Sequence, residues 1–436
     1  MPRMFARASR LLLLLSVPAL ALAACSNSSG GNTTAGETDG ITANQITVGG
    51  IAAATGPLAD QYSPLFQTVQ TYFDQVNAKG GVFGRKLVLP ASNQLDDQTV
   101  PSVDVSQARQ LVEAGHVFAV FVATPNFSSG PYLGQHNVPT FGVGINPEWT
   151  DYPSLFAADQ GSHITFTTPG TGLPYEAQRL GTNKIGIIAY SISASANCAV
   201  GSVASFKAYH QQVVLDDTSL PFGVTDVSGD ILRLKSSGAG LVTTCMDATG
   251  NLVVSKGLLQ AGIFNSVKQN WPNGVDQPTI DANSQVMQGI YFFDGTGGLV
   301  PTDYGITQGM DQYLNSMAAN HLPVGPVTRA SWMAAQLFVQ GLKMAGPNPT
   351  RGKVVNSLNT LSDWQSGGMV ARIDWTVQHT KGSPINCAAY QQVQGNKLQL
   401  IWGSGKDPFV CWPAGPLPKT LATIPFPGNE KAFFNG

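Results

Sequence analysis

The chain has 436 residues, of which 43% are hydrophobic and only 11% are charged, and its formal net charge is −2. This balance excludes a protein that captures nucleic acid or anionic lipid with a basic surface, because such a surface needs clustered Lys and Arg. The chain is also longer than one hydrophobic core usually holds, so two domains are expected.

Residues 1–24 have the pattern of an export signal. Arg3, Arg7 and Arg10 precede an apolar run from Leu11 to Ala24. A membrane-spanning helix needs about 20 apolar residues, so a cleaved signal peptide is favoured over a permanent span. Its removal takes away three of the 24 basic residues and none of the 26 acidic ones, which leaves the mature chain at −5.

The end of the apolar run, Leu22-Ala23-Ala24-Cys25, resembles a bacterial lipobox, in which the Cys thiol receives the lipid after cleavage. Residues 26–40 contain no apolar side chain larger than Ala. Such a segment cannot bury surface, so residues 25–41 are expected to form a lipidated Cys and a flexible tether. The protein is thus expected to be exported and held at the outer face of the cell membrane by lipid alone.

The segment from Ile46 to Leu89 predicts a strand, a turn, a helix and a second strand. A short apolar run begins at Ile46 and ends at Thr55-Gly56-Pro57, as in a strand that is buried on both faces. From Pro64 to Val76 the apolar residues fall on one helical stripe, which Gly80-Gly81 ends. The right-handed crossover rule makes the two strands parallel, so the loop after the first strand lies where open α/β sheets bind ligands.

This segment resembles the opening of the type I periplasmic binding proteins, in the branched-chain amino-acid-binding group that serves ABC transporters. The resemblance rests on Thr55-Gly56-Pro57-Leu58, Asn77-Ala78-Lys79-Gly80-Gly81-Val82 and Gly84-Arg85-Lys86, and it continues weakly to about Leu400. It implies an α/β fold of two doubly wound, Rossmann-like lobes with parallel central sheets, joined by a hinge of three crossings. The expected lobes are residues 42–166 with 284–378, and residues 167–283 with 379–436.

The resemblance also implies where a solute binds. In the family, the loops after two strands of the first lobe hold the polar head of the ligand, and Asn126, Ser128 and Asn146 match those positions. In the second lobe, Asp247 is the acid that could meet a cationic group. The further candidates for the site are Thr55, Tyr62, Phe127, Gly144 and Trp271. For each loop a purely structural role remains an alternative, and the aromatic residues could equally be core.

Four cysteines remain besides Cys25. They are an even number in an exported chain, which favours disulfides. Of the three possible pairings, we favour Cys198 with Cys245 at one sheet edge, and Cys387 with Cys411 across a terminal hairpin. No metal site is expected, because the sequence has no CxxC and its His residues show no ligand spacing.

The implied function is that of an extracytoplasmic lipoprotein that captures an amino acid or a related amide or organic solute for an ABC importer. Its partners would be the solute and the permease and ATPase subunits. We expect a monomer without cofactor. Family members that bind amino acids carry Tyr-Gly where this chain has residues 193–199, which disfavours a plain α-amino acid and leaves a more apolar or aromatic solute open. A sensing module for a membrane receptor is the alternative, and no hydrolase, nucleotide-binding or metalloprotease motif supports an enzyme.

Overall fold

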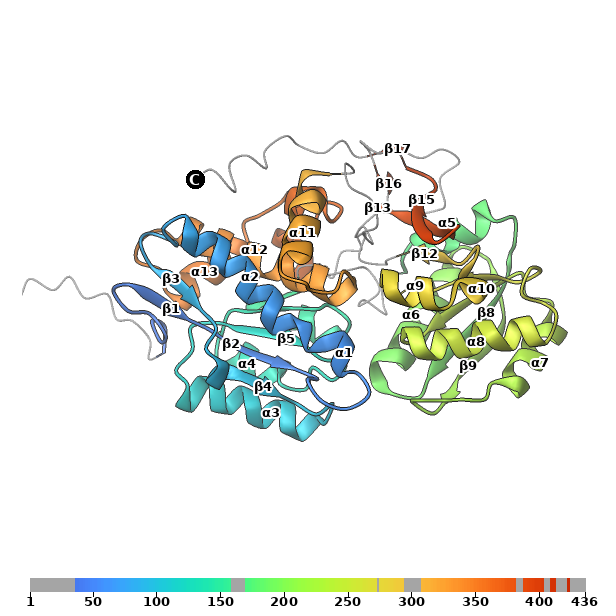
Figure 1. Ribbon diagram of the computed structural model, residues 1–436, viewed down its shortest axis with the longest axis horizontal. Coiled ribbons are helices and arrows are strands. Elements are labelled where there is room, and N and C mark those ends of the chain that lie inside the picture. Colours follow the sequence, from blue (N-terminus) through green and yellow to red (C-terminus); the bar gives the residue numbers. More distant parts are fainter. Residues whose placement is uncertain are drawn as a thin grey trace, which may run out of the picture. The chain divides into compact units, whose positions relative to one another are not determined.

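The computed structural model describes residues 36–157, 169–272, 274–293, 307–381, 387–403, 408–412 and 422–423. The expected signal peptide and Cys25 lie outside these residues. Two main β-sheets, each covered by helices, organise the described part of the chain (Figure 1). None of its helices is long and apolar enough to cross a membrane.

The first lobe is built on five parallel strands in the order β4-β2-β5-β6-β7. Their bounds are β2 Gly49–Ala52, β4 Gln94–Asp96, β5 Val120–Ala123, β6 Thr140–Gly142 and β7 Leu155–Ala157. A separate parallel pair joins β1, Gln45–Thr47, to β3, Lys86–Val88. The apolar run that begins at Ile46 therefore contains two short strands with different partners.

Helices cover both faces of this sheet. They are α1 Ala59–Tyr62, α2 Pro64–Ala78, α3 Pro101–Arg109, α4 Gly130–Gln135, α11 Gln308–Ala319, α12 Pro326–Ala345, α13 Arg351–Leu358 and α14 Trp375–Lys381. A π-helical turn, Gln110–Ala114, extends α3, and 3-10 turns span Ala91–Asn93, Pro147–Thr150 and Ser366–Gly368.

The side chains of β5 show how the strand alternation builds two cores. Phe121 contacts Phe73 of α2 and Phe338 of α12, with ring centroids 5.7 and 5.6 Å apart. Its neighbours Val120 and Val122 belong to the core cluster on the opposite face. Both faces of the strand are thus buried, as its continuous apolar sequence predicts.

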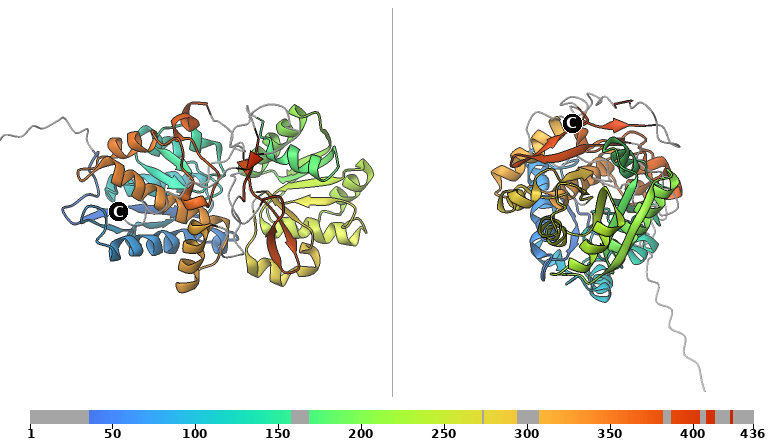
Figure 2. Two further views of the ribbon diagram at one scale, coloured as in Figure 1. Left: turned by 90° about the horizontal axis from the view of Figure 1, so that it is seen from above. Right: turned by 90° about the vertical axis from the view of Figure 1, so that its right-hand side faces the viewer.

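The second lobe is built on seven strands in the order β15-β14-β12-β11-β10-β8-β9. Strands β8 to β12 are parallel, and the hairpin β14–β15 is antiparallel at one edge (Figure 2). The bounds are β8 Lys184–Tyr190, β9 Gln212–Leu220, β10 Leu241–Cys245, β11 Lys268–Asn270, β12 Tyr291–Phe293, β14 Tyr390–Gln394 and β15 Lys397–Leu400.

Six helices accompany this sheet among the described residues: α5 Gly172–Arg179, α6 Ser193–Ala208, α7 Ser228–Ser237, α8 Ala248–Gln260, α9 Gln277–Ala282 and α10 Ser284–Met287. A small antiparallel sheet joins β13 Cys387–Ala388, β16 Val410–Cys411 and β17 Ala422–Thr423. Helix α6 begins at Ser193, so residues 193–199 form its first turns.

The predicted fold class, two α/β lobes with parallel sheets, is confirmed. The expected boundary between residues 283 and 284, however, lies ahead of β12, which pairs with β11 and β14 in the second sheet. The described chain therefore does not rejoin the first lobe until after Phe293. Of the three expected crossings, the one between residues 166 and 167 lies outside the described residues.

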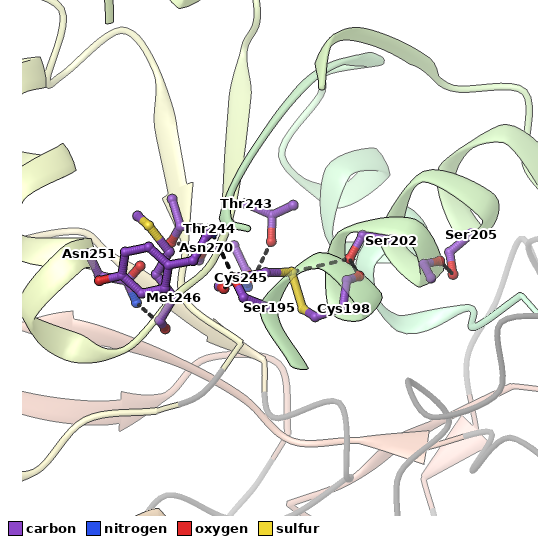
Figure 3. Close-up of a disulfide and its surroundings, with 12 residues drawn as sticks. Ser195, Cys198, Ser202, Ser205, Thr243, Thr244, Cys245, Met246, Asn251 and Asn270 are labelled. Atoms are coloured by element: carbon purple, nitrogen blue, oxygen red, sulfur yellow. Dashed lines mark hydrogen bonds between the residues drawn. A yellow bond between two sulfur atoms is a disulfide. The ribbon is translucent and has the colours of Figure 1, made fainter. Parts of the chain in front are cut away.

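Both favoured disulfides are present. Cys198 is bonded to Cys245, and Cys387 is bonded to Cys411. Figure 3 shows the first of them, which joins the first turns of α6 to the last residue of β10. Ser195 reinforces this joint, since its hydroxyl accepts a hydrogen bond from the Tyr190 N–H at 2.7 Å and donates one to the Cys245 carbonyl.

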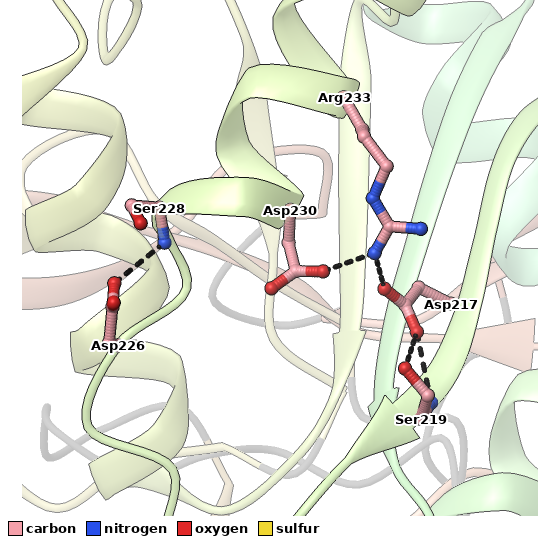
Figure 4. A network of polar contacts seen from close by, with 6 residues as sticks. All are labelled: Asp217, Ser219, Asp226, Ser228, Asp230 and Arg233. Atoms are coloured by element: carbon pink, nitrogen blue, oxygen red, sulfur yellow. Dashed lines mark hydrogen bonds and ion pairs between the residues drawn. The ribbon is translucent and has the colours of Figure 1, made fainter.

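A polar network fixes the outer strand of the second sheet (Figure 4). The Arg233 guanidinium donates to the carboxylates of Asp217 and Asp230, and the Ser219 hydroxyl donates to Asp217 at 2.6 Å. Burial opposes the ionisation of Asp217, but its hydrogen bonds with Asp230 and Ser219 and the charge of Arg233 lower its pKa to about 2. The network thus ties α7 to β9 and has a structural role.

The end of the expected tether is held against the first lobe. The Glu37 carbonyl accepts from the Arg351 N–H at 2.9 Å, and its carboxylate accepts from the Gly352 N–H at 2.7 Å. These N–H groups belong to the first turn of α13, where an acidic side chain is favourable. The ordered contacts of the first lobe therefore begin at residues 36–39, before the first strand.

Candidate functional site

The loop after β5 is held by hydrogen bonds to a buried carboxylate. Asp104 of α3 accepts hydrogen bonds from the Ser129 N–H at 2.6 Å and from the Ser129 hydroxyl at 2.9 Å. Burial raises the pKa of Asp104 to about 7, although these hydrogen bonds act in the opposite direction. The loop of residues 124–129 is consequently fixed at its end, where α4 begins.

Asn126 and Ser128 lie on this loop and are both half-buried. The Asn126 side-chain amide donates to the Thr99 carbonyl at 2.8 Å, so it ties the loop to the chain after β4. The Ser128 N–H donates to the Asn126 carbonyl at 2.7 Å. In this structure the Asn126 amide nitrogen therefore shapes the loop.

Asn146 connects the two predicted loops of the first lobe. It follows β6, is only 5% exposed, and donates from Nδ2 to the Pro125 carbonyl at 3.0 Å. Its Oδ1 is buried and accepts no hydrogen bond from the described residues. A buried acceptor without a partner costs about 1–3 kcal/mol, so Asn146 Oδ1 is a natural attachment point for a hydrogen-bond donor.

Phe127 and Gly144 belong to the framework of these loops. Phe127 is buried and stacks on Trp149 with ring centroids 4.1 Å apart. Gly144 is buried between β6 and Asn146. Both residues lie beside Asn126 and Asn146 in the sequence, but the ring of Phe127 is part of the core and supports the loop from within.

Two acids at the end of β4, Asp96 and Asp97, were not foreseen as site residues. Asp96 accepts from the Ala54 N–H at 2.9 Å and from the exposed Thr55 hydroxyl at 2.5 Å. Burial opposes the ionisation of Asp96, but these bonds and those from Thr55 N–H and Gln98 N–H lower its pKa below the ordinary value. Thr55 thus fixes the loop after β2 onto the end of β4.

Asp97 is fully buried directly after Asp96. Its Oδ1 accepts from the Thr99 N–H at 2.8 Å, whereas its Oδ2 accepts no hydrogen bond from the described residues. Burial raises the pKa of Asp97, and a hydrogen bond with Thr124 opposes the rise. Asp97 and Asn146 therefore each have a buried oxygen that has no partner among the described residues.

Tyr62 is buried at the end of α1. Burial raises its pKa far above the ordinary value, and the charges of Asp247 and Asp97 add to the rise. Its hydroxyl therefore stays neutral at any physiological pH. The pKa of Tyr62 is thus raised by the charge of Asp97 in the first lobe and by the charge of Asp247 in the second.

In the second lobe, Asp247 follows β10 and caps α8. Its Oδ1 accepts from the Gly250 N–H at 3.1 Å and from the Tyr190 hydroxyl at 2.6 Å. A Cβ atom on Gly250 would lie 1.9 Å from the Tyr190 hydroxyl oxygen, so only Gly allows this approach. Tyr190, the last residue of β8, is a partner that the sequence analysis missed.

Trp271 does not join this group. It is fully buried in the core of the second lobe, with its ring 5.7 Å from that of Phe292. The strand before it is β11, which ends at Asn270. In the structure Trp271 is thus a core residue.

The sequence analysis also missed a buried carboxyl group of the second lobe. Glu176 of α5 is fully buried and accepts from the Asn270 side-chain amide at 2.8 Å. Burial raises the pKa of Glu176 to about 8. No group of three or more His, Cys, Asp or Glu side chains in the described chain is arranged to hold a metal ion.

Comparison with known proteins agrees with this architecture. Residues 45–397 match the family model described as periplasmic binding protein. The Leu/Ile/Val-binding protein homolog 7 of Brucella abortus is 24% identical over 315 residues, which cover 68% of this chain and 76% of that protein.

Two solved structures share the fold. The solute-binding protein of an ABC transporter from R. palustris, in complex with benzoate, has a TM-score of 0.65 at 16% identity and covers 86% of this chain and 100% of that one. The fatty acid ABC transporter substrate-binding protein from Thermomonospora curvata has a TM-score of 0.66 at 13% identity and covers 84% and 93%. The family match, which spans most of the chain, shows that this protein belongs to the periplasmic binding proteins, a family of extracytoplasmic solute-binding proteins of the ABC transporter type.

Proposed function

We propose that this protein captures one small solute between the carboxyl ends of its two parallel sheets and delivers it to an ABC permease and its ATPase. The observation that carries the proposal is a pair of buried oxygens that accept no hydrogen bond from the described residues, Asn146 Oδ1 and Asp97 Oδ2. They lie after strands β6 and β4, at the edge where open α/β sheets bind ligands. Closure of two such lobes would enclose a solute, and this requires no chemical reaction.

The solute is an amino acid or a related amide or organic molecule in this proposal. The names of similar proteins include leucine, benzoate and fatty acid as ligands, so the family accommodates diverse small molecules. In this chain the first turns of α6, Ser193 to Ala199, carry no aromatic side chain. The aromatic residue next to Asp247 is instead Tyr190.

Substitution of Asn146 or Asp247 tests the site. With a ligand found in a thermal-shift screen, we expect a dissociation constant in the micromolar range, about −8 kcal/mol. Asn146→Ala is expected to weaken binding by about 1–3 kcal/mol because it removes a buried polar partner, and Asp247→Ala by a similar amount or more. Calorimetry measures both changes.

Asp281→Asn, on the exposed part of α9, is the matched control and is expected to bind as the wild type does. If Asn146→Ala and Asp247→Ala remain folded and also bind as the wild type does, the solute does not contact these loops. Turnover of the ligand by the pure protein would instead indicate an enzyme.

We further propose that Cys25 carries the membrane anchor. Cys25→Ala is expected to abolish lipidation and leave the precursor uncleaved or released from the membrane, because each buried acyl CH₂ contributes about 0.8 kcal/mol to anchoring. Mass spectrometry of the mature N-terminus and membrane fractionation measure this. A wild-type protein that is freely soluble and carries no acyl mass would contradict the proposal.

A further inference from the structure

The described loops that follow the parallel strands β2, β4, β5, β6, β8, β9 and β10 carry acidic side chains and no basic ones. We define the strand-end loops as residues 53–63, 97–100, 124–129, 143–150, 191–195, 221–227 and 246–250. Their ionisable side chains, apart from tyrosine, are Asp60, Asp97, Glu148, Asp226 and Asp247, and they include no Lys, Arg or His. An anionic solute would therefore meet no cationic side chain on these loops.

Several backbone N–H groups of the same loops are already occupied by the protein. Such groups, at helix starts and in turns, are the usual alternative to Lys and Arg for binding a carboxylate. Asp96 Oδ1 alone accepts from the N–H groups of Ala54 and Thr55 at 2.9 and 3.3 Å. The other N–H groups bonded to a side chain of the protein include those of Thr99 (Asp97, 2.8 Å), Asn126 (Thr124, 3.2 Å), Ser129 (Asp104, 2.6 Å) and Gly250 (Asp247, 3.1 Å).

Acceptors, in contrast, remain unused. Asp97 is fully buried and Asn146 is 5% exposed, and Asp97 Oδ2 and Asn146 Oδ1 accept no hydrogen bond from the described residues. Asp97 Oδ1 accepts from the Thr99 N–H, the Thr99 carbonyl accepts from the Asn126 amide, and Asn146 donates to the Pro125 carbonyl, so both side chains are linked to residues 125 and 126. A buried carboxylate is tolerated best beside a positive charge that also donates hydrogen bonds.

We propose that the solute carries a protonated amine, which donates its N–H groups to Asp97 and Asn146, and that it needs no carboxylate. This inference rests on the proposed function, because it assigns the chemistry of the solute at that site. It differs from the benzoate and the fatty acid named for the two solved relatives, since those ligands are anions. Asp247 in the second lobe supplies a further negative charge for the same cation.

Matched probes test this directly. The full mature chain is titrated by calorimetry and thermal shift with 3-methylbutylamine and benzylamine, and with the corresponding acids, 4-methylpentanoate and benzoate. Leucine carries both charged groups on the first skeleton. We expect the amines to bind and raise the melting temperature, and the two acids to have no effect.

Binding of the acids without the amines would overturn the inference while supporting the proposed function. If none of the five probes binds, the inference is also contradicted, and a screen of neutral solutes then decides the proposed function separately. The inference is likewise contradicted if leucine binds and neither amine binds, because a carboxylate would then be required.

Variants locate the amine on the residues named here. Asp97→Asn is expected to weaken amine binding about tenfold or more, and Asn146→Ala several-fold, by the cost of losing one buried partner. Asp74→Asn makes the same Asp-to-Asn change on the exposed face of α2. It is the control and is expected to leave the affinity for the amine unchanged. A folded Asp97→Asn variant with wild-type affinity would overturn the assignment. If the Asp97→Asn variant does not fold, a folded Asn146→Ala variant with wild-type affinity would overturn it instead.

Discussion

Replacement of Cys198 and Cys245 by serine is expected to lower the free energy of unfolding by about 4 kcal/mol. The two residues are 47 positions apart, and the chain-entropy model gives about this value for a loop of that length. The bond also joins the start of α6 to the end of β10, two residues before Asp247. Its loss is therefore expected to reduce the affinity for the solute as well, because Asp247 and its partner Tyr190 would lose a common support.

The second disulfide supplies the control. Cys387 and Cys411 are 24 residues apart, so their replacement is expected to cost about 3.5 kcal/mol by the same model, without direct effect on Asp247. Urea denaturation and calorimetry on both double variants separate the two effects. Equal losses of affinity in both variants would show that the Cys198–Cys245 bond has no special role in positioning Asp247.

The parts of the fold that could be predicted are those with strong apolar patterns. The apolar run Lys184 to Tyr190 forms β8, and every residue after Lys184 is buried. The apolar stripe from Pro64 forms α2, which ends at Ala78 just before Gly80-Gly81. In both segments local propensity and burial agree.

Short polar strands could not be predicted in this way. Strand β11 consists of Lys268, Gln269 and Asn270, and no hydrophobic pattern marks it. It is buried because Ser255 donates to Gln269 at 2.5 Å and Thr243 donates to Asn270 at 3.1 Å. These partners are distant in sequence, so no local pattern indicates a strand before Trp271.

The candidate site shows the same limit. Asn146 and Asp247 follow well-marked strands and could be named from sequence. Asp97 follows β4, a strand of three half-buried residues, Gln94–Asp96. Its role depends on the Thr124 and Thr99 contacts that only the folded chain provides. The available local signal is the pair of adjacent aspartates, Asp96 and Asp97.

The stability of the protein is expected to fall as the pH rises from about 5 to 8, with Glu176 as a main cause. Burial raises the pKa of this carboxyl from 4.5 to about 8. Between these values the folded state holds a proton that the unfolded state has lost, so each pH unit costs about 1.4 kcal/mol of unfolding free energy. The total loss from this group is about 5 kcal/mol, and it ends above pH 8.

Glu176→Gln isolates this contribution. The amide is uncharged at every pH, and its oxygen can still accept from the Asn270 amide, which lies 2.8 Å from Glu176 Oε2. The variant is therefore expected to match the wild type near pH 5 and to be more stable by several kcal/mol at pH 8. Burial also raises the pKa of Asp104, to about 7, so this group makes both the wild type and the variant less stable as the pH rises. The informative quantity is therefore the difference between the urea midpoints of the two proteins at each pH. Parallel curves from pH 5 to 8.5 would show that Glu176 is already ionised in the folded protein, with its charge stabilised by contacts beyond Asn270.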